Sequence, residues 1–174
     1  MLKISKKKEF SSVQVELPKN IADRIFQWGK KNIDNEDVVP NPYNGSSGRE
    51  KEGHLTVKFG LHTSKVEDVE KVVNGFGSFD VELDEVSKFE KETEYHVLKI
   101  GVKGQKLLEL NKLISKKLEC TDTYSTYQPH VTIAYVKTGS CEHLVGDEEF
   151  KGVKIKFDKI VFSSKDEIKR VISL

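Results

Sequence analysis

One short pattern occurs twice in this chain and constrains its fold more than any other feature. The tetrapeptides His54–Val57 and His130–Ile133 both read His-x-Thr-aliphatic, and each lies in a run of strand-forming residues, HLTVKFGL and HVTIAYV. Residues i and i+2 of a strand point to the same face of a sheet. Each copy therefore predicts an imidazole and a hydroxyl side by side on one face, with Phe59 or Tyr135 among the residues turned to the other face.

Chance does not readily produce this repeat. The composition gives an expectation of roughly 0.2 His-x-Thr triplets in a chain of this length. The alternative is that both histidines are ordinary strand residues, each beside a threonine that a strand favours. Two such strands brought together would instead place two imidazoles and two hydroxyls in one cleft, which suits the binding of a phosphodiester and the movement of two protons.

The chemistry of such a cleft needs no metal. One imidazole can remove a proton from an attacking hydroxyl while the other protonates the departing oxygen, and the ordinary histidine pKa of about 6.5 suits both steps near neutral pH. Threonine hydroxyls can donate to the non-bridging phosphoryl oxygens. The chain has no Cys-x-x-Cys, His-Glu-x-x-His or Walker-type phosphate loop, so we expect no metal and no cofactor.

Composition and charge limit the partners. A chain of 174 residues is expected to form a single domain, residues 1–174, and its net charge of +1 argues against binding long duplex DNA, which usually requires a marked basic excess. A short or cyclic nucleotide needs only a few positive groups. No apolar stretch is long enough to cross a membrane, and MLKISKKKEF lacks the apolar core of a secretory signal, so we expect a cytoplasmic monomer.

Apolar periodicity predicts strands and helices in a mixed order, with neither simple strand-helix alternation nor separate blocks. We expect strands over 11–17, 54–61, 79–89, 93–102, 130–136, 153–164 and 168–174, the third and fourth forming a hairpin. Helices are expected over 19–32, from a capping box at Ser64 to Asn74, over 104–118 and, in a short form, within 139–149. This order is consistent with two lobes that each contribute one motif strand.

Two polar loops precede the motif strands. Residues 33–53 form a long loop rich in Asn, Pro, Gly and Ser, which is either a functional lid or a disordered insertion. Tyr43 in this loop, Tyr127 before the second motif and Phe10 before the first strand are candidates for stacking on a nucleobase, with ordinary packing as the alternative for each. Lys58 is in phase with the first motif, and could add positive charge to the cleft or be a surface residue.

The paired motifs resemble those of the two-histidine (2H) phosphoesterase superfamily, which includes the bacterial LigT-type RNA cyclic phosphodiesterases. This resemblance implies a bilobal α+β fold in which two antiparallel-rich sheets flank a central cleft and helices lie outside. It implies activity without metal on 2′,3′-cyclic phosphates or on 2′-5′ and 3′-5′ linkages. By this resemblance His54 and His130 are the proton-transfer pair, and Thr56 and Thr132 bind the phosphate.

A narrower resemblance extends over most of the chain. The segments FSSVQVELPKNIADRIFQWGKKNI, GREKEGHLTVKFGLH, QPHVTIAYV and VFSSKD are similar to phage nucleases that degrade the cyclic oligonucleotide signals of CBASS immunity. This implies a metal-independent phosphodiesterase that cleaves 3′-5′ linkages of cyclic di- or trinucleotides, in the bacterial host cytoplasm if the chain is phage-encoded. Two alternatives stay open: a LigT-type RNA 2′,3′-cyclic phosphodiesterase or 2′-5′ RNA-processing enzyme, and an inactive nucleotide-binding module.

Overall fold

The computed structural model describes residues 8–90 and 93–174, and the strands in these ranges form one antiparallel sheet. Most of the segment on which we based the absence of a secretory signal, residues 1–7, lies outside the described residues. The strands are β1 (Ser11–Glu16), β2 (His54–Leu61), β3 (Phe79–Phe89), β4 (His96–Lys103), β5 (His130–Val136), β6 (Lys154–Phe157), β7 (Lys159–Ser163) and β8 (Lys169–Ser173). Their order in the sheet is β6-β3-β4-β5-β2-β1-β7-β8.

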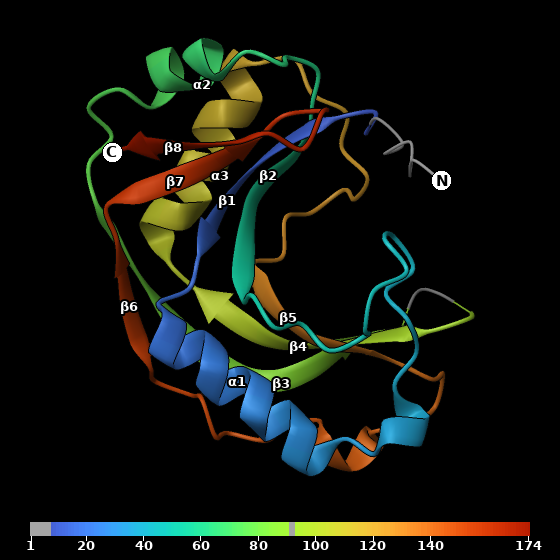
Figure 1. Cartoon of the computed structure of the whole chain (residues 1–174). Helices are drawn as coiled ribbons and strands as arrows, with labels where there is room; N and C mark the ends of the chain where they lie inside the picture. The colour runs from blue at the N-terminus through green and yellow to red at the C-terminus, as the bar shows by residue number, and fades with distance from the viewer. Residues whose placement is uncertain (1–7, 91–92) are drawn as a thin grey trace.

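The two sheets expected from the sequence meet at the centre of this single sheet. Within the described ranges β2 and β5 share one ladder pair, Leu55 with Val131, whereas the other neighbouring strands pair over several residues. We call β1, β2, β7 and β8 the first half of the sheet and β3 to β6 the second half. The sheet curves into a half-barrel with both motif strands near its middle (Figure 1). The predicted α+β, bilobal architecture with one motif strand in each half is confirmed.

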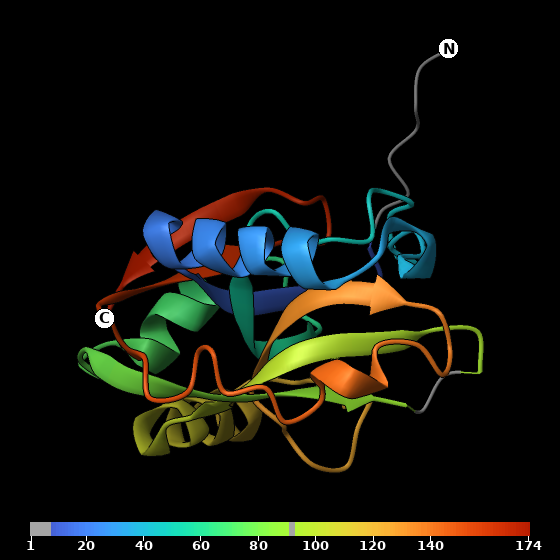
Figure 2. The same cartoon turned by 90° about the horizontal axis from the view of Figure 1, so that it is seen from below.

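The helices are exchanged between the two halves. α1 (Lys19–Asn32) follows β1 of the first half but packs against β5, where Gly29 allows the helix to approach Ile133 closely. α3 (Gln105–Lys117) follows β4 of the second half but packs partly against β2 of the first, and its apolar side is buried completely at Leu107, Leu110 and Ile114. Figure 2 shows α1 and α3 with the strands between them.

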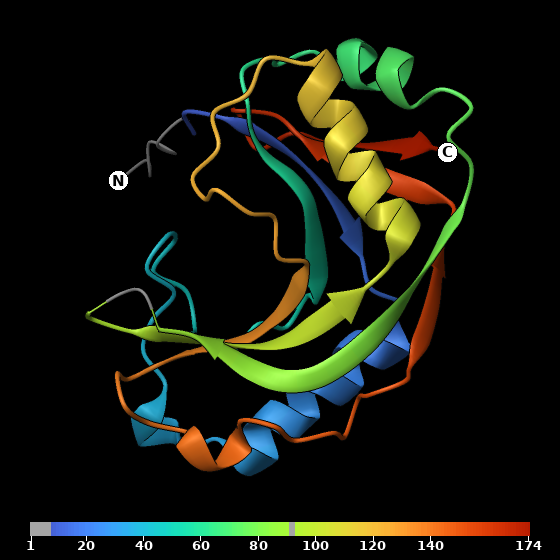
Figure 3. The same ribbon diagram turned by 180° about the vertical axis from the view of Figure 1, so that it is seen from behind.

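The remaining helices are short. α2 (Val66–Val73) lies beside α3, as Figure 3 shows from behind. One 3-10 turn, Asn35–Asp37, lies in the loop before β2, and another, Glu142–Leu144, lies where a short helix was expected within 139–149. None of the helices in the described ranges has both the length and the apolar character that a membrane span requires.

Two expectations about element boundaries are wrong. The strand predicted over 153–164 is two strands, because the chain leaves β3 after β6, passes Asp158 and joins β1 in the other half as β7. The capping box at Ser64 does not form. The turn before α2 is held by Thr63 instead, whose hydroxyl accepts the amide of Lys65 and donates to the carboxylate of Asp68.

Candidate active site

The two motifs lie side by side because the strands that carry them meet at their central residues. Leu55 and Val131 are direct cross-strand partners, and both are completely buried. The flanking residues therefore point to the opposite face, which we call the motif face: His54, Thr56, His130 and Thr132. On neighbouring strands in this register, the two histidines are diagonal neighbours, with a separation of about 7–8 Å between backbone positions.

Each imidazole is oriented by the backbone two residues before it. The Nδ1 atom of His130 lies 2.7 Å from the carbonyl oxygen of Gln128, and that of His54 lies 3.3 Å from the carbonyl oxygen of Glu52. A carbonyl can only accept, so Nδ1 carries the hydrogen in both rings. This leaves Nε2 of each ring for proton transfer. The threonine hydroxyls have no hydrogen-bond partner within the described residues.

A β-bulge follows the threonine of each motif at the same position. In β2 the ladder with β1 passes from Thr56 to Lys58, which leaves Val57 as the extra residue. In β5 the ladder with β4 passes from Thr132 to Ala134, which leaves Ile133 as the extra residue. An inserted residue reverses the alternation of the side chains that follow it, up to the next irregularity, which in β2 lies at Gly60. The two copies of the motif thus share not only their sequence but also a bulge at the same position.

The first bulge overturns two predictions from strict alternation. Lys58 lies opposite the completely buried Val13, on the face away from the motif, and its amine pairs with Asp122. The prediction that Lys58 is in phase with the motif is therefore wrong. Phe59, expected on the other face, lies opposite Ser12 with an exposed fraction of 48%.

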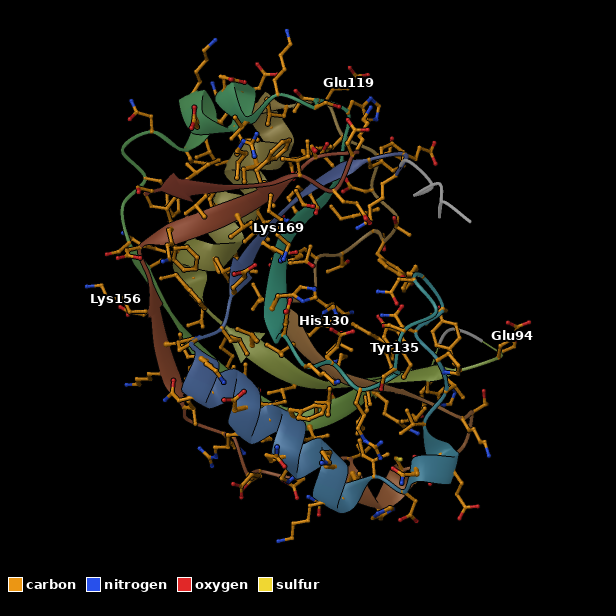
Figure 4. All side chains as sticks on the ribbon, in the orientation of Figure 1. Glu94, Glu119, His130, Tyr135, Lys156 and Lys169 are labelled. Atoms are coloured by element: carbon orange, nitrogen blue, oxygen red, sulfur yellow. The ribbon has the colours of Figure 1, made fainter. Side chains whose placement is uncertain are left out.

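The second bulge brings Tyr135 onto the motif face in the same way. Tyr135 lies opposite Val97 and makes edge contacts with the rings of Tyr43 and Tyr95. We call these three tyrosines the Tyr135 cluster. In Figure 4, Tyr135 lies between His130 and Glu94 along the lower edge of the opening of the half-barrel.

An aromatic cluster in the first half corresponds to this one. Phe10 contacts Phe59 edge-on, at 6.0 Å between ring centroids, and stacks on His62 at 5.5 Å. We call these three residues the Phe59 cluster. His62 also hydrogen-bonds to Thr121, so the cluster is attached to the loop before β5. Two of the rings proposed from the sequence, Phe10 and Tyr43, thus lie in different clusters, one in each half.

The loops before the motif strands are exchanged between the halves. Residues 33–53 precede β2 but run along β5, with backbone hydrogen bonds from Val39 to Tyr135 and from Glu50 to Ile133. The loop before β5 runs along β2, where Leu61 pairs with Cys120. Of the two interpretations of 33–53, a disordered insertion is wrong, because the segment forms a sheet edge beside the second motif.

Two features hold the loop before β5 against β2. Gly60 has a φ of +85°, and a Cβ atom there would lie 2.0 Å from the carbonyl oxygen of Thr121, so only glycine permits this approach. Tyr127 donates its hydroxyl to the carbonyl oxygen of Thr56 at 2.7 Å. Burial raises the pKa of Tyr127, so the hydroxyl remains a donor. The expected stacking role of Tyr127 does not fit these contacts, which make it an anchor for the first motif.

A cation that the sequence did not reveal lies beside the second motif. Lys99 of β4 is the cross-strand partner of Thr132, and its amine lies 4.3 Å from the ring centroid of Phe89. The ring of Phe89 in turn meets the ring of His130 at 4.8 Å. Burial lowers the pKa of His130, with Lys99 and His54 adding to this shift, while the hydrogen bond to Gln128 opposes it.

The first motif has a different charged neighbour. Glu16 of β1 is the cross-strand partner of His54, and its carboxylate pairs with the amine of Lys169 at 3.0 Å. The charge beside His54 is therefore balanced by an ion pair. Figure 4 shows Lys169 and His130 near the centre of the view.

Two cavities occur outside the paired motifs, and one of them is lined by Glu16, the cross-strand partner of His54. One cavity of about 340 Å³ lies within the loop around Asn35 and Arg49, and another of about 380 Å³ lies between Glu16 and Lys156. Neither cavity is lined by a motif histidine.

One group in the described residues has the ligand types of a metal site. Glu90, His96 and Glu142 place one ligand atom each within 4.8 Å of one another. The amine of Lys88 already pairs with both carboxylates and offsets one of their two negative charges. It lies outside the motif face and supplies no ligand to the paired histidines.

Comparison with known proteins agrees with this geometry. A curved antiparallel sheet that brings two His-x-Thr strands together is the architecture of a two-histidine phosphoesterase. A family model described as the 2′-5′ RNA ligase superfamily matches residues 39–159, more than half of the chain, and the chain therefore belongs to that superfamily. None of the curated proteins matches the chain.

Solved structures share the fold at low sequence identity. Escherichia coli LigT complexed with 3′-AMP aligns with a TM-score of 0.65 and 16% identity over 95% of each chain. The same protein complexed with phosphate aligns with a TM-score of 0.62 and 15% identity over 98% of this chain and 96% of that one. TT0787 of Thermus thermophilus aligns with a TM-score of 0.62 and 14% identity over 94% of this chain and 95% of that one.

Proposed function

We propose that this protein is a metal-independent phosphodiesterase that cleaves 3′-5′ linkages of short oligonucleotides, with cyclic di- and trinucleotides as the preferred substrates. The observation that carries the proposal is the diagonal placement of His54 and His130 on one face, each with Nδ1 held by a carbonyl and Nε2 available. A phosphorus atom between the rings would have one imidazole on each side.

The reaction requires one neutral and one protonated histidine. The neutral imidazole accepts the proton of the substrate's 2′-hydroxyl, whose oxygen then bonds to phosphorus. The bond from phosphorus to the 5′-oxygen breaks, and the protonated imidazole supplies the proton to that oxygen. The product carries a 2′,3′-cyclic phosphate, which the same pair can open with water. Thr56 and Thr132 donate to the non-bridging oxygens, where negative charge increases in the transition state.

The two aromatic clusters support a substrate with a nucleoside on each side of the phosphate. Phe10 with Phe59 lies in the first half, and Tyr43 with Tyr135 lies in the second. Aromatic side chains bind nucleobases by stacking with little sequence preference. Phe10 and Tyr43 are therefore proposed as base-binding residues of opposite subsites, and Lys58 and Tyr127 are not.

A second candidate is an RNA phosphodiesterase that processes 2′,3′-cyclic phosphate ends or 2′-5′ linkages. The superfamily description and the LigT complex with 3′-AMP favour it. The third, a binding module without activity, is disfavoured because a binder has no need for two oriented imidazoles and two free hydroxyls at one place.

One experiment separates these candidates. The protein is incubated in EDTA with cyclic dinucleotides, cyclic trinucleotides, 2′-5′-linked dinucleotides and RNA ending in a 2′,3′-cyclic phosphate, and the products are identified by mass spectrometry. We expect linear products from the cyclic oligonucleotides in the wild type and none in His54→Ala. Turnover of the RNA substrates alone would select the second candidate, recovery of intact ligand after tight binding the third, and loss of turnover on adding EDTA would contradict a metal-independent reaction.

A further inference from the structure

Three lysines on strands β2, β3 and β4 have strongly buried side chains, and the partners of their amines differ. The side chain of Lys58 is 5% exposed and pairs with Asp122, and that of Lys88 is 2% exposed and pairs with Glu90 and Glu142. Lys99 is 8% exposed. Within the described residues its amine contacts the hydroxyl of Ser87 at 2.7 Å and the ring face of Phe89, and no carboxylate.

A buried ammonium without a carboxylate is unfavourable in the free protein. Burial of a charge costs several kcal/mol unless an opposite charge or several hydrogen bonds compensate it. One neutral hydroxyl and one ring face compensate the Lys99 charge only in part, and burial accordingly lowers the pKa of Lys99. An anion that completes this environment would bind with a favourable charge interaction.

The position of Lys99 identifies the anion. Its cross-strand partner is Thr132, so its side chain lies on the motif face beside the hydroxyl that is free for phosphate. The Phe89 ring contacts both the ammonium and the ring of His130. We infer that Lys99 is the fixed positive charge of this site, which draws a phosphodiester toward Thr132 and holds His130 in the neutral, proton-accepting form.

This inference rests on the proposed function and gives the histidines distinct roles. The titratable groups that act on His130 are Lys99 from β4 and His54 from β2, while β3 presents the uncharged Phe89 and the preceding loop the Gln128 carbonyl. A proton on His130 would add a second positive charge near Lys99. His130 is thus the base, and His54, beside the balanced pair of Glu16 and Lys169, is the acid.

The test compares Lys99→Met with Lys58→Met, which removes an equally buried amine outside the motif face. Binding of inorganic phosphate is measured by calorimetry. We expect Lys99→Met to weaken binding about 10- to 100-fold, as for the loss of one charged contact, and Lys58→Met to leave it unchanged. Lys99→Arg, which keeps the charge, should recover most of the binding. Lys99→Gln serves as the uncharged variant if Lys99→Met does not fold.

A second readout separates charge from packing. Histidine NMR titration of the free protein should show a higher pKa for His130 in Lys99→Met than in the wild type, because a like charge has been removed. In the wild type His130 is neutral above a pKa that is already lowered, so the acidic limb of kcat/KM lies at low pH and should move to higher pH in the variant. Lys58→Met should leave both unchanged.

The outcomes divide clearly. Wild-type phosphate affinity together with an unchanged His130 titration in Lys99→Met would overturn the assignment. Both readouts are independent of turnover, so altered binding and titration in a protein that cleaves no oligonucleotide would refute the proposed function and leave the role of Lys99 standing. Unchanged binding and titration in an active enzyme would refute the role of Lys99 alone.

Discussion

The two motif strands have the same local design and different neighbours. Both present a histidine held by the carbonyl two residues earlier, a free threonine hydroxyl, and a bulge one residue further on. The flanking strands differ. β1 brings Glu16, already paired with Lys169, to His54, whereas β4 brings Lys99, which contacts no carboxylate among the described residues, toward His130. In the proposed mechanism the motif supplies the reacting groups, and the adjacent strands determine which histidine donates a proton and which accepts one.

Removing one histidine at a time tests the roles of the two motifs and has the largest expected effect. His54→Ala and His130→Ala should each lower kcat by at least about 10²-fold, because an acid or a base is lost. The double variant should be little slower than either single one if the two rings act on the same phosphate. His143→Ala, an exposed histidine outside the motif face, is the control. Multiplicative losses would show that the rings act independently.

The hydroxyls test whether the phosphate lies midway between the halves. Thr56→Val and Thr132→Val keep the side-chain shape and should each lower kcat by about 10²-fold, as for the loss of one donor to the transition state. Thr138→Val is the control, since its hydroxyl bonds to the carbonyl of Thr93 away from the site. Losses that differ by more than tenfold would place the phosphate in one half.

Two glycine variants test whether the loop before β5, which runs along β2, supports the site. Gly60→Ala and Gly139→Ala both force a side chain to a positive φ, at +85° and +78°, and this conformation alone should cost each variant about 1–2 kcal/mol of stability. Only at position 60 does the new Cβ meet the backbone of Thr121, whereas at 139 nothing lies within 4 Å. We expect a loss in kcat/KM of about 10-fold or more for Gly60→Ala alone. Equal activity in both variants would show that this loop does not support the site.

The smallest expected effect concerns the anchor of the same loop. Tyr127→Phe removes the hydrogen bond to the Thr56 carbonyl and should lower the free energy of unfolding by about 1 kcal/mol, with a loss in kcat of less than about 5-fold. Thermal unfolding and steady-state kinetics measure the two effects. A large rise in KM with normal stability would contradict the anchoring role and show instead that the Tyr127 hydroxyl contacts the substrate.

The sequence predicted the bounds of three strands correctly, although not the irregularities within them. β2, β3 and β5 have the expected bounds, because apolar residues at every second position require one buried face. The bulges at Val57 and Ile133 were not predictable, since both are aliphatic strand formers without the Gly or Pro that marks many irregularities. Missing the first of these placed Lys58 and Phe59 on the wrong faces.

The paired histidines were accessible from the sequence, and Lys99 was not. The motif identifies its residues directly. The residues that neighbouring strands bring beside it depend on strand pairing and register, which a single sequence does not contain. One signal was present. Lys99 stands between Leu98 and Ile100 in an apolar strand, where an unpaired charge is costly and so points to a role.

The exchange of loops and helices makes the molecule indivisible. The edge of each motif strand is completed by a loop that leads, along the chain, into the motif strand of the opposite half, so neither half would be self-sufficient if produced alone. A polypeptide cut between the halves would leave two open strand edges, which are sites for aggregation. The candidate active site therefore forms only when the whole polypeptide has folded, so its geometry depends on the entire fold.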